Sequence, residues 1–347
     1  MKRIVKYDLL RVVSCFAIVL LHVSGSYWHA VDVESKDFAT MTVYNSLTRF
    51  GVPVFFMLSG LFVLDPDKSF SVDKWVKKTV KLAACFFIWS FFYGFQSVLF
   101  HGVLSGWSSV GPEMWSSAVN RLVTGHAHMW YLLDLLGFYL ILPILRKICE
   151  DIRIAGYFFL LWVTVQFVIA TVLPGGGRAL AFVAGMHLYL LTGYIGYFVG
   201  GFWLDKIALP RGWRYALYVS GMGALLFTMW RTIADCRASS TYDERWFSPS
   251  NINVLIISAA VFVFFKHLEL PRRLTDSGGI SMMAKSTFFV YMIHPFFIEK
   301  LNLLGIKVIA FPVALSIPVM SIGIFAVCMF LGHLVSRIPV IGKIVLF

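Results

Sequence analysis

The chain has 347 residues, of which 59% are hydrophobic and 14% charged, and its formal net charge at pH 7 is +12. Soluble domains average about 45–50% apolar and about 25% charged residues, so this composition excludes an ordinary soluble enzyme. The positive charge does not indicate a nucleic-acid partner, because no nucleic-acid-binding motif accompanies it and basic loops beside anionic lipid account for it.

Ten apolar runs approach the length of about 20 residues that crosses a bilayer. They cover residues 8–26, 47–65, 82–101, 128–145, 154–173, 182–203, 215–233, 251–267, 285–303 and 308–332. We therefore expect an all-α membrane protein, a polytopic bundle of about ten transmembrane helices. Residues 1–347 are expected to form a single membrane domain with no appended soluble domain. In the sixth run, Gly196 and Gly200 are small residues that allow neighbouring helices to approach closely.

The distribution of basic residues predicts the orientation. When both termini are placed in the cytoplasm, most of the 30 lysines and arginines fall on the inner side, as the positive-inside rule requires. The longer loops, at about 27–46, 102–127 and 234–250, then lie on the outer side.

The first run carries two ionisable side chains, Arg11 and His22, and Asp8 opens it. An ionisable residue in a membrane helix is costly, so it indicates a functional site unless it snorkels to the interface. At about 100° per residue, Arg11 and His22 return to within about 20° of the same face, about 16 Å apart along the axis. The spacing predicts that Arg11 and His22 lie on one stripe along the helix surface, with the cation near the inner end and the imidazole near the outer end.

Further polar residues stand near the outer ends of other runs. Arg49 opens the second run and His128 opens the fourth. If the helices of these runs pack beside the first helix, Arg49 and His128 lie at a similar depth to His22 and could meet it. Asp134 follows His128 by six positions, about 240°, so these two do not share a face. On a helix the side chains of His126 and His128 diverge by about 200°, so we expect no metal site.

Two other patterns stand out along the chain. His294-Pro295 interrupts the ninth run, and a proline that kinks a helix can help to line a cavity. Lys74, Lys77, Lys78 and Lys81 have the i, i+3, i+4, i+7 spacing of one helical face. This basic face suits either lipid head groups or a phosphate clamp for a charged donor entering from the cytosol.

Five motifs, in order along the whole chain, resemble those of the integral-membrane acyltransferase family three, which includes bacterial O-acetyltransferases of surface polysaccharides. The motifs are Arg11-x10-His22, Arg49-Phe-Gly-Val-Pro-Val-Phe-Phe-Met-Leu-Ser59-Gly60, Trp75-Val-Lys77-Lys78-Thr-Val-Lys81, His128-Met-Trp130-Tyr131-Leu through Arg146, and Tyr291-Met-Ile-His294-Pro295. The third motif departs from the family, which commonly has arginine there. Lysine offers point charges rather than bidentate forks.

The resemblance implies a multi-pass protein of the bacterial inner membrane that takes an acyl group, usually acetyl, from cytosolic acyl-coenzyme A. The acceptor would be a hydroxyl or amino group of a cell-envelope glycan or lipid-linked sugar. His22 would act as general base or as nucleophile. Arg49 and His128 would polarise the thioester or orient His22, and Arg11, Lys77, Lys78 and Lys81 would hold the coenzyme. Supporting roles fall to Asp8, Ser59, Trp130, Tyr131, Tyr291 and His294, and Asp134 is a further candidate for fixing a histidine tautomer.

The competing interpretation is a proton- or substrate-coupled transporter or flippase of a glycan precursor. Such a protein would use its ionisable residues to bind a proton or a substrate without chemistry. The sequence has no detectable inverted repeat, and only the His294-Pro295 run fits the broken helices of transporters. The five motifs therefore favour the enzyme.

Overall fold

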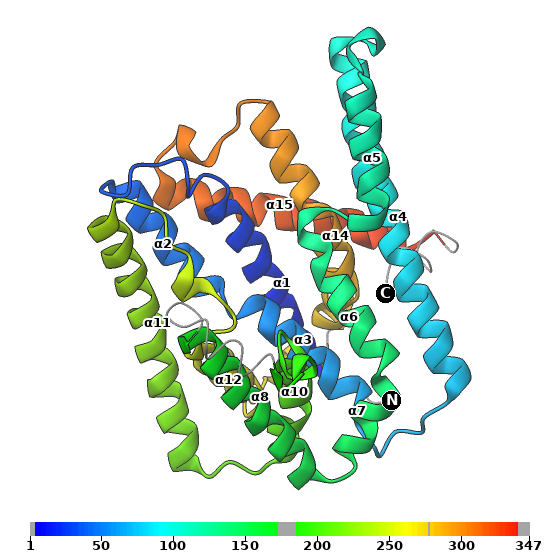
Figure 1. The fold of residues 1–347 in the computed structure, drawn as a ribbon, viewed down its shortest axis with the longest axis vertical. Helices are drawn as coiled ribbons and strands as arrows, with labels where there is room; N and C mark the ends of the chain where they lie inside the picture. The colour runs from blue at the N-terminus through cyan, green and yellow to red at the C-terminus, as the bar shows by residue number, and fades with distance from the viewer. Residues whose placement is uncertain (1–3, 173–184, 277, 339–347) are drawn as a thin grey trace. The chain divides into compact units, whose positions relative to one another are not determined.

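The structure is a computed structural model that describes residues 4–172, 185–276 and 278–338, and within these ranges it contains helices and loops but no β-strand (Figure 1). The chain divides into two compact units. The first unit comprises residues 1–66 and 144–330, and the second comprises residues 67–143 and 331–347.

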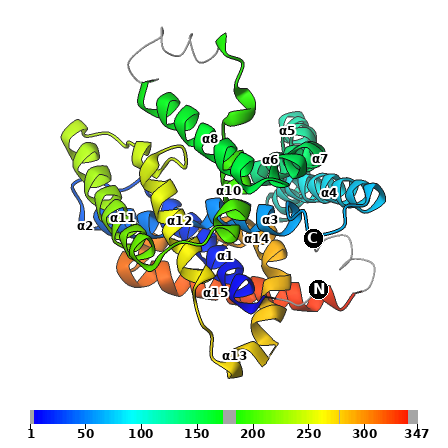
Figure 2. The ribbon, with the colours of Figure 1, turned by 90° about the horizontal axis from the view of Figure 1, so that it is seen from below.

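The first unit holds most of the described helices. They are α1 (Val5–Gly25), α2 (Lys36–Thr48), α3 (Gly51–Val63), α8 (Ile152–Val172), α10 (Ile195–Lys206), α11 (Arg211–Ser239), α12 (Ile252–Lys266), α13 (Arg272–Asp276) and α14 (Gly279–Leu303). Most of α7 (Leu142–Cys149) and α15 (Val313–Ser336) also belongs to it. Helix α1 packs against α2, α3, α12 and α14, while α11 lies beside α12 (Figure 2). The first helix is therefore surrounded by helices from both ends of the chain.

Glycines set the closest helix contacts in this unit. A Cβ added at Gly60 of α3 would lie 1.7 Å from the backbone oxygen of Phe198 in α10, and one at Gly201 would lie 2.1 Å from that of Met57. Gly196 faces Trp162 and Gly200 faces Phe159, with added Cβ atoms at 1.7 and 2.6 Å. The close approach predicted for the glycines of the sixth run is confirmed, because no side chain with a Cβ fits these contacts.

Several basic side chains cap the C-terminal ends of helices in the first unit. The Arg146 guanidinium donates to the carbonyl of Val63 at the end of α3 (2.8 Å), and the Lys266 ammonium donates to that of Leu204 in α10 (2.9 Å). Lys6 donates in turn to the carbonyl of Lys266. Cations near a helix C-terminus satisfy orphan carbonyls and complement the helix dipole. Part of the positive charge therefore stabilises the fold itself.

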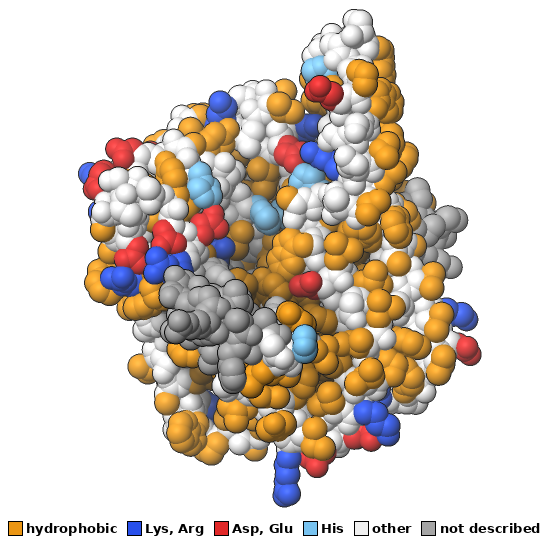
Figure 3. All heavy atoms as spheres, in the orientation of Figure 1, with side chains coloured by type: hydrophobic (Ala, Val, Ile, Leu, Met, Phe, Trp, Pro, Cys, Tyr) orange, Lys and Arg blue, Asp and Glu red, His pale blue; other side chains and the backbone are white. Residues whose placement is uncertain are grey.

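The second unit is built on α4 (Val72–Ser105), which pairs with α5 (Pro112–Thr124) and contacts α6 (Trp130–Leu140). At about 1.5 Å per residue, the 34 residues of α4 extend about 51 Å. An added Cβ at Gly94 would lie 2.6 Å from the backbone oxygen of Ala118, so α4 and α5 also meet through a glycine. Hydrophobic side chains lie along the outside of this hairpin, among them the exposed Phe91, Leu99 and Val103 (Figure 3). A row of exposed apolar side chains is the surface expected to face lipid.

Five helical stretches of the described residues are long and apolar enough to cross a membrane. They are Val5–Gly25, Lys36–Val63, Val72–Ser105, Arg245–Lys266 and Val313–Ser336. Each of the ten predicted runs overlaps a helix, but α10 has only 12 residues, about 18 Å, and the hydrocarbon core is about 30 Å thick. The protein is an all-helical multi-pass membrane protein. The count of ten crossings and the cytoplasmic termini stay predictions.

The structure differs from the sequence-based elements at four places. The run 128–145 is not one helix, because α6 ends at Leu140 and α7 begins at Leu142, with Pro143 at the start of the new helix. Residues 36–46, expected in a loop, belong to α2, whose N-cap Ser35 accepts from the amide of Phe38 (3.0 Å). The expected loop 102–127 contains α5, with Pro112 at its first position. His294-Pro295 does not end its helix, since α14 runs through Pro295.

Short 3-10 turns join some of these helices. They are η1 (Trp107–Ser109), η2 (Ala127–Met129), η3 (Tyr189–Leu191), η4 (Arg245–Phe247) and η5 (Val308–Ala310).

Candidate active site

Helix α1 carries both Arg11 and His22 without a break, so the predicted stripe has the continuous helix that it needs. Near the N-terminal end of α1, Asp8 is buried and accepts a hydrogen bond from the hydroxyl of Ser281 on α14 (2.8 Å). The guanidinium carbon of Arg11 lies 5.6 Å from the centre of the Phe62 ring on α3, within the range of a cation–π contact. Packing against α3 and α14 therefore orients this end of the stripe.

The half-buried His22 meets a second histidine from the far end of the chain. The ring centres of His22 and His294 are 5.0 Å apart, with 49° between the ring planes. His294 has no exposed surface, and its Nδ1 lies 3.0 Å from the carbonyl oxygen of Val290, one helical turn earlier. The packing of α1 against α14 brings together His22 and His294, which the sequence placed on separate runs.

Tyr291 stands beside this histidine pair on α14. Its ring is buried, with its centre 6.1 Å from that of His294 and 6.5 Å from that of Phe55 on α3. Ser59, also predicted to support the site, is half-buried on α3 and donates to the carbonyl of Phe55 (2.9 Å). A serine that bonds to the carbonyl four residues earlier has an ordinary helical role. Tyr291 therefore stands beside the histidine pair in the packing of α14.

Arg49 is the C-cap residue of α2, and the segment around it packs against α1. An added Cβ at Gly25 of α1 would touch the amide of Asn45, at 3.4 Å, and one at Gly51 would touch the side chain of Ile18, at 3.1 Å. His22 falls between Ile18 and Gly25, and Arg49 falls between Asn45 and Gly51. Because the two chain segments run in opposite directions, these contacts place the segment that contains Arg49 against the C-terminal part of α1. That Arg49 meets His22 stays a prediction.

The Arg49 side chain is held by an aromatic ring that the sequence did not single out. Its guanidinium carbon lies 4.0 Å from the centre of the Phe247 ring, which is buried in η4. The Nε atom is buried and has no hydrogen-bond partner among the described residues. The sequence predicts residues 234–250 only as an outer loop, and no periodicity in this segment distinguishes Phe247 from other aromatic residues.

The second unit holds a different histidine pair. The Nδ1 atoms of His126 and His128 are 2.9 Å apart, and the Tyr93 ring lies against both, at 4.3 and 5.1 Å between ring centres. The predicted divergence of these side chains is wrong. His126 has extended backbone angles and precedes η2, so the 100° step of an α-helix does not apply between the two residues.

The other predicted residues of this region have varied surroundings. Tyr131 and His128 are buried, Asp134 is half-buried and Trp130 is 37% exposed, as suits a ring at the outside of a helix. Among the residues that the structure describes, no three His, Cys, Asp or Glu side chains are grouped as metal ligands are.

The predicted basic face lies at the start of α4. Lys77 and Lys78 are exposed and Lys81 is half-buried, within the first three turns of the helix. Trp75 of the same motif donates from its indole nitrogen to the carbonyl of Tyr139 (2.6 Å). The N-terminal end of a helix favours anions, so the lysines and the helix dipole attract the same kind of ligand.

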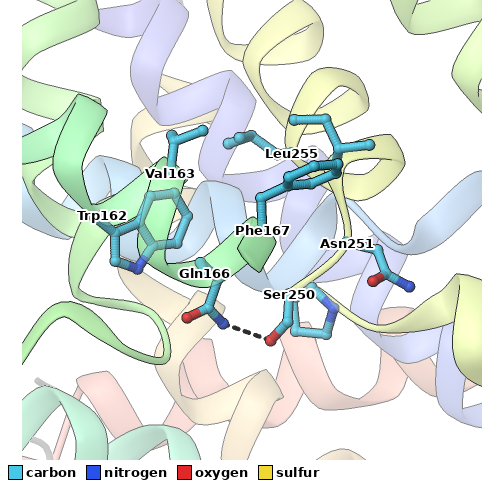
Figure 4. A pocket seen from close by; sticks show the side chains of 9 residues that line it. Trp162, Val163, Gln166, Phe167, Ser250, Asn251 and Leu255 are labelled. Carbon is cyan, nitrogen blue, oxygen red and sulfur yellow. Dashed lines mark hydrogen bonds between the residues drawn. The ribbon is translucent and has the colours of Figure 1, made fainter. Parts of the chain in front are cut away.

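A small cavity lies between α8 and the start of α12 (Figure 4). Gln166 donates across it to the hydroxyl of Ser250 (2.6 Å), and Trp162, Phe167 and Leu255 form its apolar walls. Its volume at the scale of a water molecule is about 10 Å³, enough for about one water. The cavity is too small for a thioester or a sugar, and none of the predicted site residues lines it.

Apolar helices with histidine and arginine side chains packed among them define a multi-pass membrane protein with a polar site inside its helical bundle. The family model of the acyltransferase domain, acyltransferase family three, matches residues 4–333. The chain therefore belongs to this family of acyltransferases. No curated protein and no solved structure matches the chain.

Proposed function

We propose that this acyltransferase moves a short acyl group, with acetyl as the leading candidate, from cytosolic acyl-coenzyme A to a hydroxyl or amino group of a cell-envelope glycan or lipid-linked sugar. The observation that carries the proposal is the position of the half-buried His22. It shares the continuous helix α1 with Arg11, and its ring lies against that of His294 on α14. Imidazole titrates near neutral pH, so it suits proton transfer from an acceptor hydroxyl.

The chemistry needs one proton to move and one bond to exchange. His22 takes the proton of the acceptor, whose oxygen or nitrogen attacks the thioester carbonyl. The new C–O or C–N bond forms, the C–S bond breaks, and the leaving thiolate takes the proton back from His22. In the second route, a ring nitrogen of His22 attacks the thioester and the C–S bond breaks to release the thiolate. The acceptor then displaces the acyl group from His22, and its proton ends on the thiolate.

The donor end of the proposed path combines Arg11 with Lys77, Lys78 and Lys81. Coenzyme A carries several phosphate charges, and the lysines at the start of α4 offer mobile cations at a helix N-terminus. Arg11 and His22 are eleven residues apart on α1, a rise of about 16 Å that matches an extended pantetheine arm. The lysines would bind the phosphates while the thioester reaches His22.

Two further side chains complete the proposed machinery. The segment that contains Arg49 packs against α1, and we assign to Arg49 and His128 the polarisation of the thioester carbonyl as negative charge develops on its oxygen. Asp8, Trp130, Tyr131 and Asp134 keep supporting roles in this proposal. The protein would reside in a bacterial inner membrane as a single membrane domain, with both termini in the cytoplasm.

Sidedness tests the proposal most directly. Acetyl-coenzyme A is added outside sealed vesicles of either orientation, and its slow hydrolysis is followed by the release of thiol, with water as the surrogate acceptor. Inverted vesicles should turn over the donor and right-side-out vesicles should not. Vesicles that contain His22→Ala provide the background rate.

Two results would overturn the proposal. Equal turnover in the two vesicle orientations would contradict a donor path that starts at the cytosolic face. Uptake of a glycan precursor with no turnover of acetyl-coenzyme A in either orientation would identify a transporter instead.

A further inference from the structure

Asn45 is a buried residue of α2 whose side-chain oxygen makes no hydrogen bond. The residue is 3% exposed, and its Oδ1 atom is buried without a partner among the described residues. The other buried polar side chains of this helix are satisfied. Thr42 accepts from Trp28, Ser46 donates to the carbonyl of Thr42, and Thr48 donates to the carbonyl of Asn45 itself. Buried polar groups are nearly always hydrogen-bonded, so the bare oxygen of Asn45 indicates a group that a bound molecule completes.

The amide of Asn45 faces the C-terminal end of α1. A Cβ added at Gly25 would lie 3.4 Å from Nδ2 of Asn45, so the amide meets α1 at a position without a side chain. Gly25 follows His22 by three residues, about 4.5 Å further along the helix and away from Arg11. The proposed donor path runs from Arg11 to His22. Asn45 therefore lies beyond the end of that path, on the side where a second substrate would approach.

The chemistry of the bare atom selects its ligand. An amide oxygen accepts hydrogen bonds and does not donate them, so its partner must carry an O–H or N–H group. A thioester and its acetyl group carry neither. A sugar hydroxyl carries an O–H, and an amino or acetamido sugar carries an N–H. The pantetheine amides also have N–H groups, but the proposed path places them between Arg11 and His22.

We infer that Asn45 is an acceptor-binding residue, whose Oδ1 accepts a hydrogen bond from a hydroxyl or N–H group of the glycan that receives the acyl group. This inference rests on the proposed function and names a residue that holds the second substrate. Arg49 follows Asn45 by four residues, and its Nε is also buried without a hydrogen-bond partner among the described residues. Side chains four apart on a helix are neighbours, so α2 offers an acceptor and a donor one turn apart.

The variant Asn45→Leu separates a ligand-binding amide from a structural one. Leucine has the same branched shape, with methyl groups in place of Oδ1 and Nδ2. Because no hydrogen bond to Oδ1 is lost and a buried bare oxygen is removed, the Tm should equal or exceed that of the wild type. A hydrogen bond to the acceptor would be lost, so transfer should fall about tenfold, the usual worth of one such bond.

Two measurements distinguish the two substrates. Inverted vesicles come from cells that normally make this protein, with the gene replaced by each variant, and receive acetyl-coenzyme A labelled in the acetyl group. The label retained in the lipid and glycan fraction reports transfer to the acceptors of the membrane itself. Thiol release by detergent-purified protein without an acceptor reports use of the donor alone. We expect Asn45→Leu to lower the first rate about tenfold and to keep kcat and KM of the second within about twofold.

Ser46→Ala is the matched control, because Ser46 is the buried neighbour on α2 and its hydroxyl bonds only to its own helix, at 2.7 Å. Both of its rates should stay within about twofold of the wild type. If Asn45→Leu does not fold, Asn45→Ala takes its place, since it removes the amide without adding bulk.

Three results for the Asn45 variant would overturn the inference. Wild-type transfer would show that no acceptor binds the amide. A raised KM for acetyl-coenzyme A in the acceptor-free assay would assign the amide to the donor. A lowered Tm with equal losses of transfer and thiol release would identify a packing residue.

The proposed function fails in a different way. If wild-type vesicles release thiol but retain no label in the lipid and glycan fraction, the proposed acceptor class falls, and the role of Asn45 falls with it. If the wild type transfers the label and the Asn45 variant transfers it equally well, only the role of Asn45 falls.

Discussion

Two histidine pairs of this protein have the same separation between ring centres, 5.0 Å, but they are assembled in different ways. His126 and His128 are two residues apart and share the Tyr93 ring within the second unit. His22 and His294 come from opposite ends of the chain, on two packed helices of the first unit. Each pair has one buried and one half-buried member.

This difference determines which parts of the structure each pair depends on. The local pair depends on a short segment and on the ring of Tyr93, so it forms wherever that segment folds. The pair on α1 and α14 exists only when the first unit is packed, and loop closure between distant segments costs entropy that the packing must offset. Variants at the two pairs should therefore differ in size and kind of effect.

The largest effect is expected at His22. Removing the imidazole in His22→Ala should lower turnover of acetyl-coenzyme A by about 10²–10⁴-fold, because a positioned general acid–base contributes about that much. Lys147→Ala, at an exposed residue outside the proposed site, provides the control and should match the wild type. The measurement is thiol release by purified protein. If His22→Ala turned over near the wild-type rate, the assignment of a catalytic role to the His22 pair would be wrong.

His128 is expected to show the next effect, because we assign to it a donor for the thioester carbonyl. His128→Ala should lower kcat by about 10²–10³-fold, as losing a donor to a developing oxyanion does. His128→Gln keeps an N–H donor and should recover part of this loss. If both variants retained full kcat, the local pair would be a packing feature around Tyr93.

The basic face of α4 should affect binding rather than chemistry. The triple change of Lys77, Lys78 and Lys81 to alanine should raise KM for acetyl-coenzyme A about tenfold and leave kcat nearly unchanged, since uniform binding energy is lost. The effect should shrink at high salt, because charges exposed to solvent are screened over about 8 Å at physiological ionic strength. Lys147→Ala is the control, since that exposed lysine pairs with Glu150 at 2.9 Å. An unchanged KM would reassign the face to lipid head groups.

The smallest effect concerns the packing of Trp28 against α2 in the first unit. Trp28 is buried and donates from Nε1 to the hydroxyl of the buried Thr42 (2.9 Å). Thr42→Val leaves the indole N–H buried without this acceptor, which should destabilise the fold by about 1–3 kcal/mol. Thr40→Val on the same helix is the control, because its hydroxyl bonds only locally, to Lys36. Thermal unfolding should shift for Thr42→Val and not for Thr40→Val, with kcat unchanged in both.

Much of the helical framework could be predicted, because the sequence signals of a helix lie in residues close together in the chain. Each of the ten apolar runs overlaps a helix, and the lysine spacing on residues 74–81 reads correctly as the face of one. The errors have local causes too. Pro143 divides one predicted run into two helices. The apolar-run criterion does not detect α2, because this helix is rich in polar residues although it buries Phe38, Met41, Thr42 and Asn45. Its N-cap Ser35 was the signal that could have revealed it.

The sequence by itself determined the membrane class, the family motifs and the placement of Arg11 and His22 on one helix, because composition and the 3.6-residue period are local properties. Only the tertiary structure decided that His22 meets His294, that Phe247 covers Arg49 and that Gly60 meets the backbone of Phe198. These contacts join segments far apart in the chain. They depend on how helix surfaces fit together in three dimensions, which no single periodicity encodes.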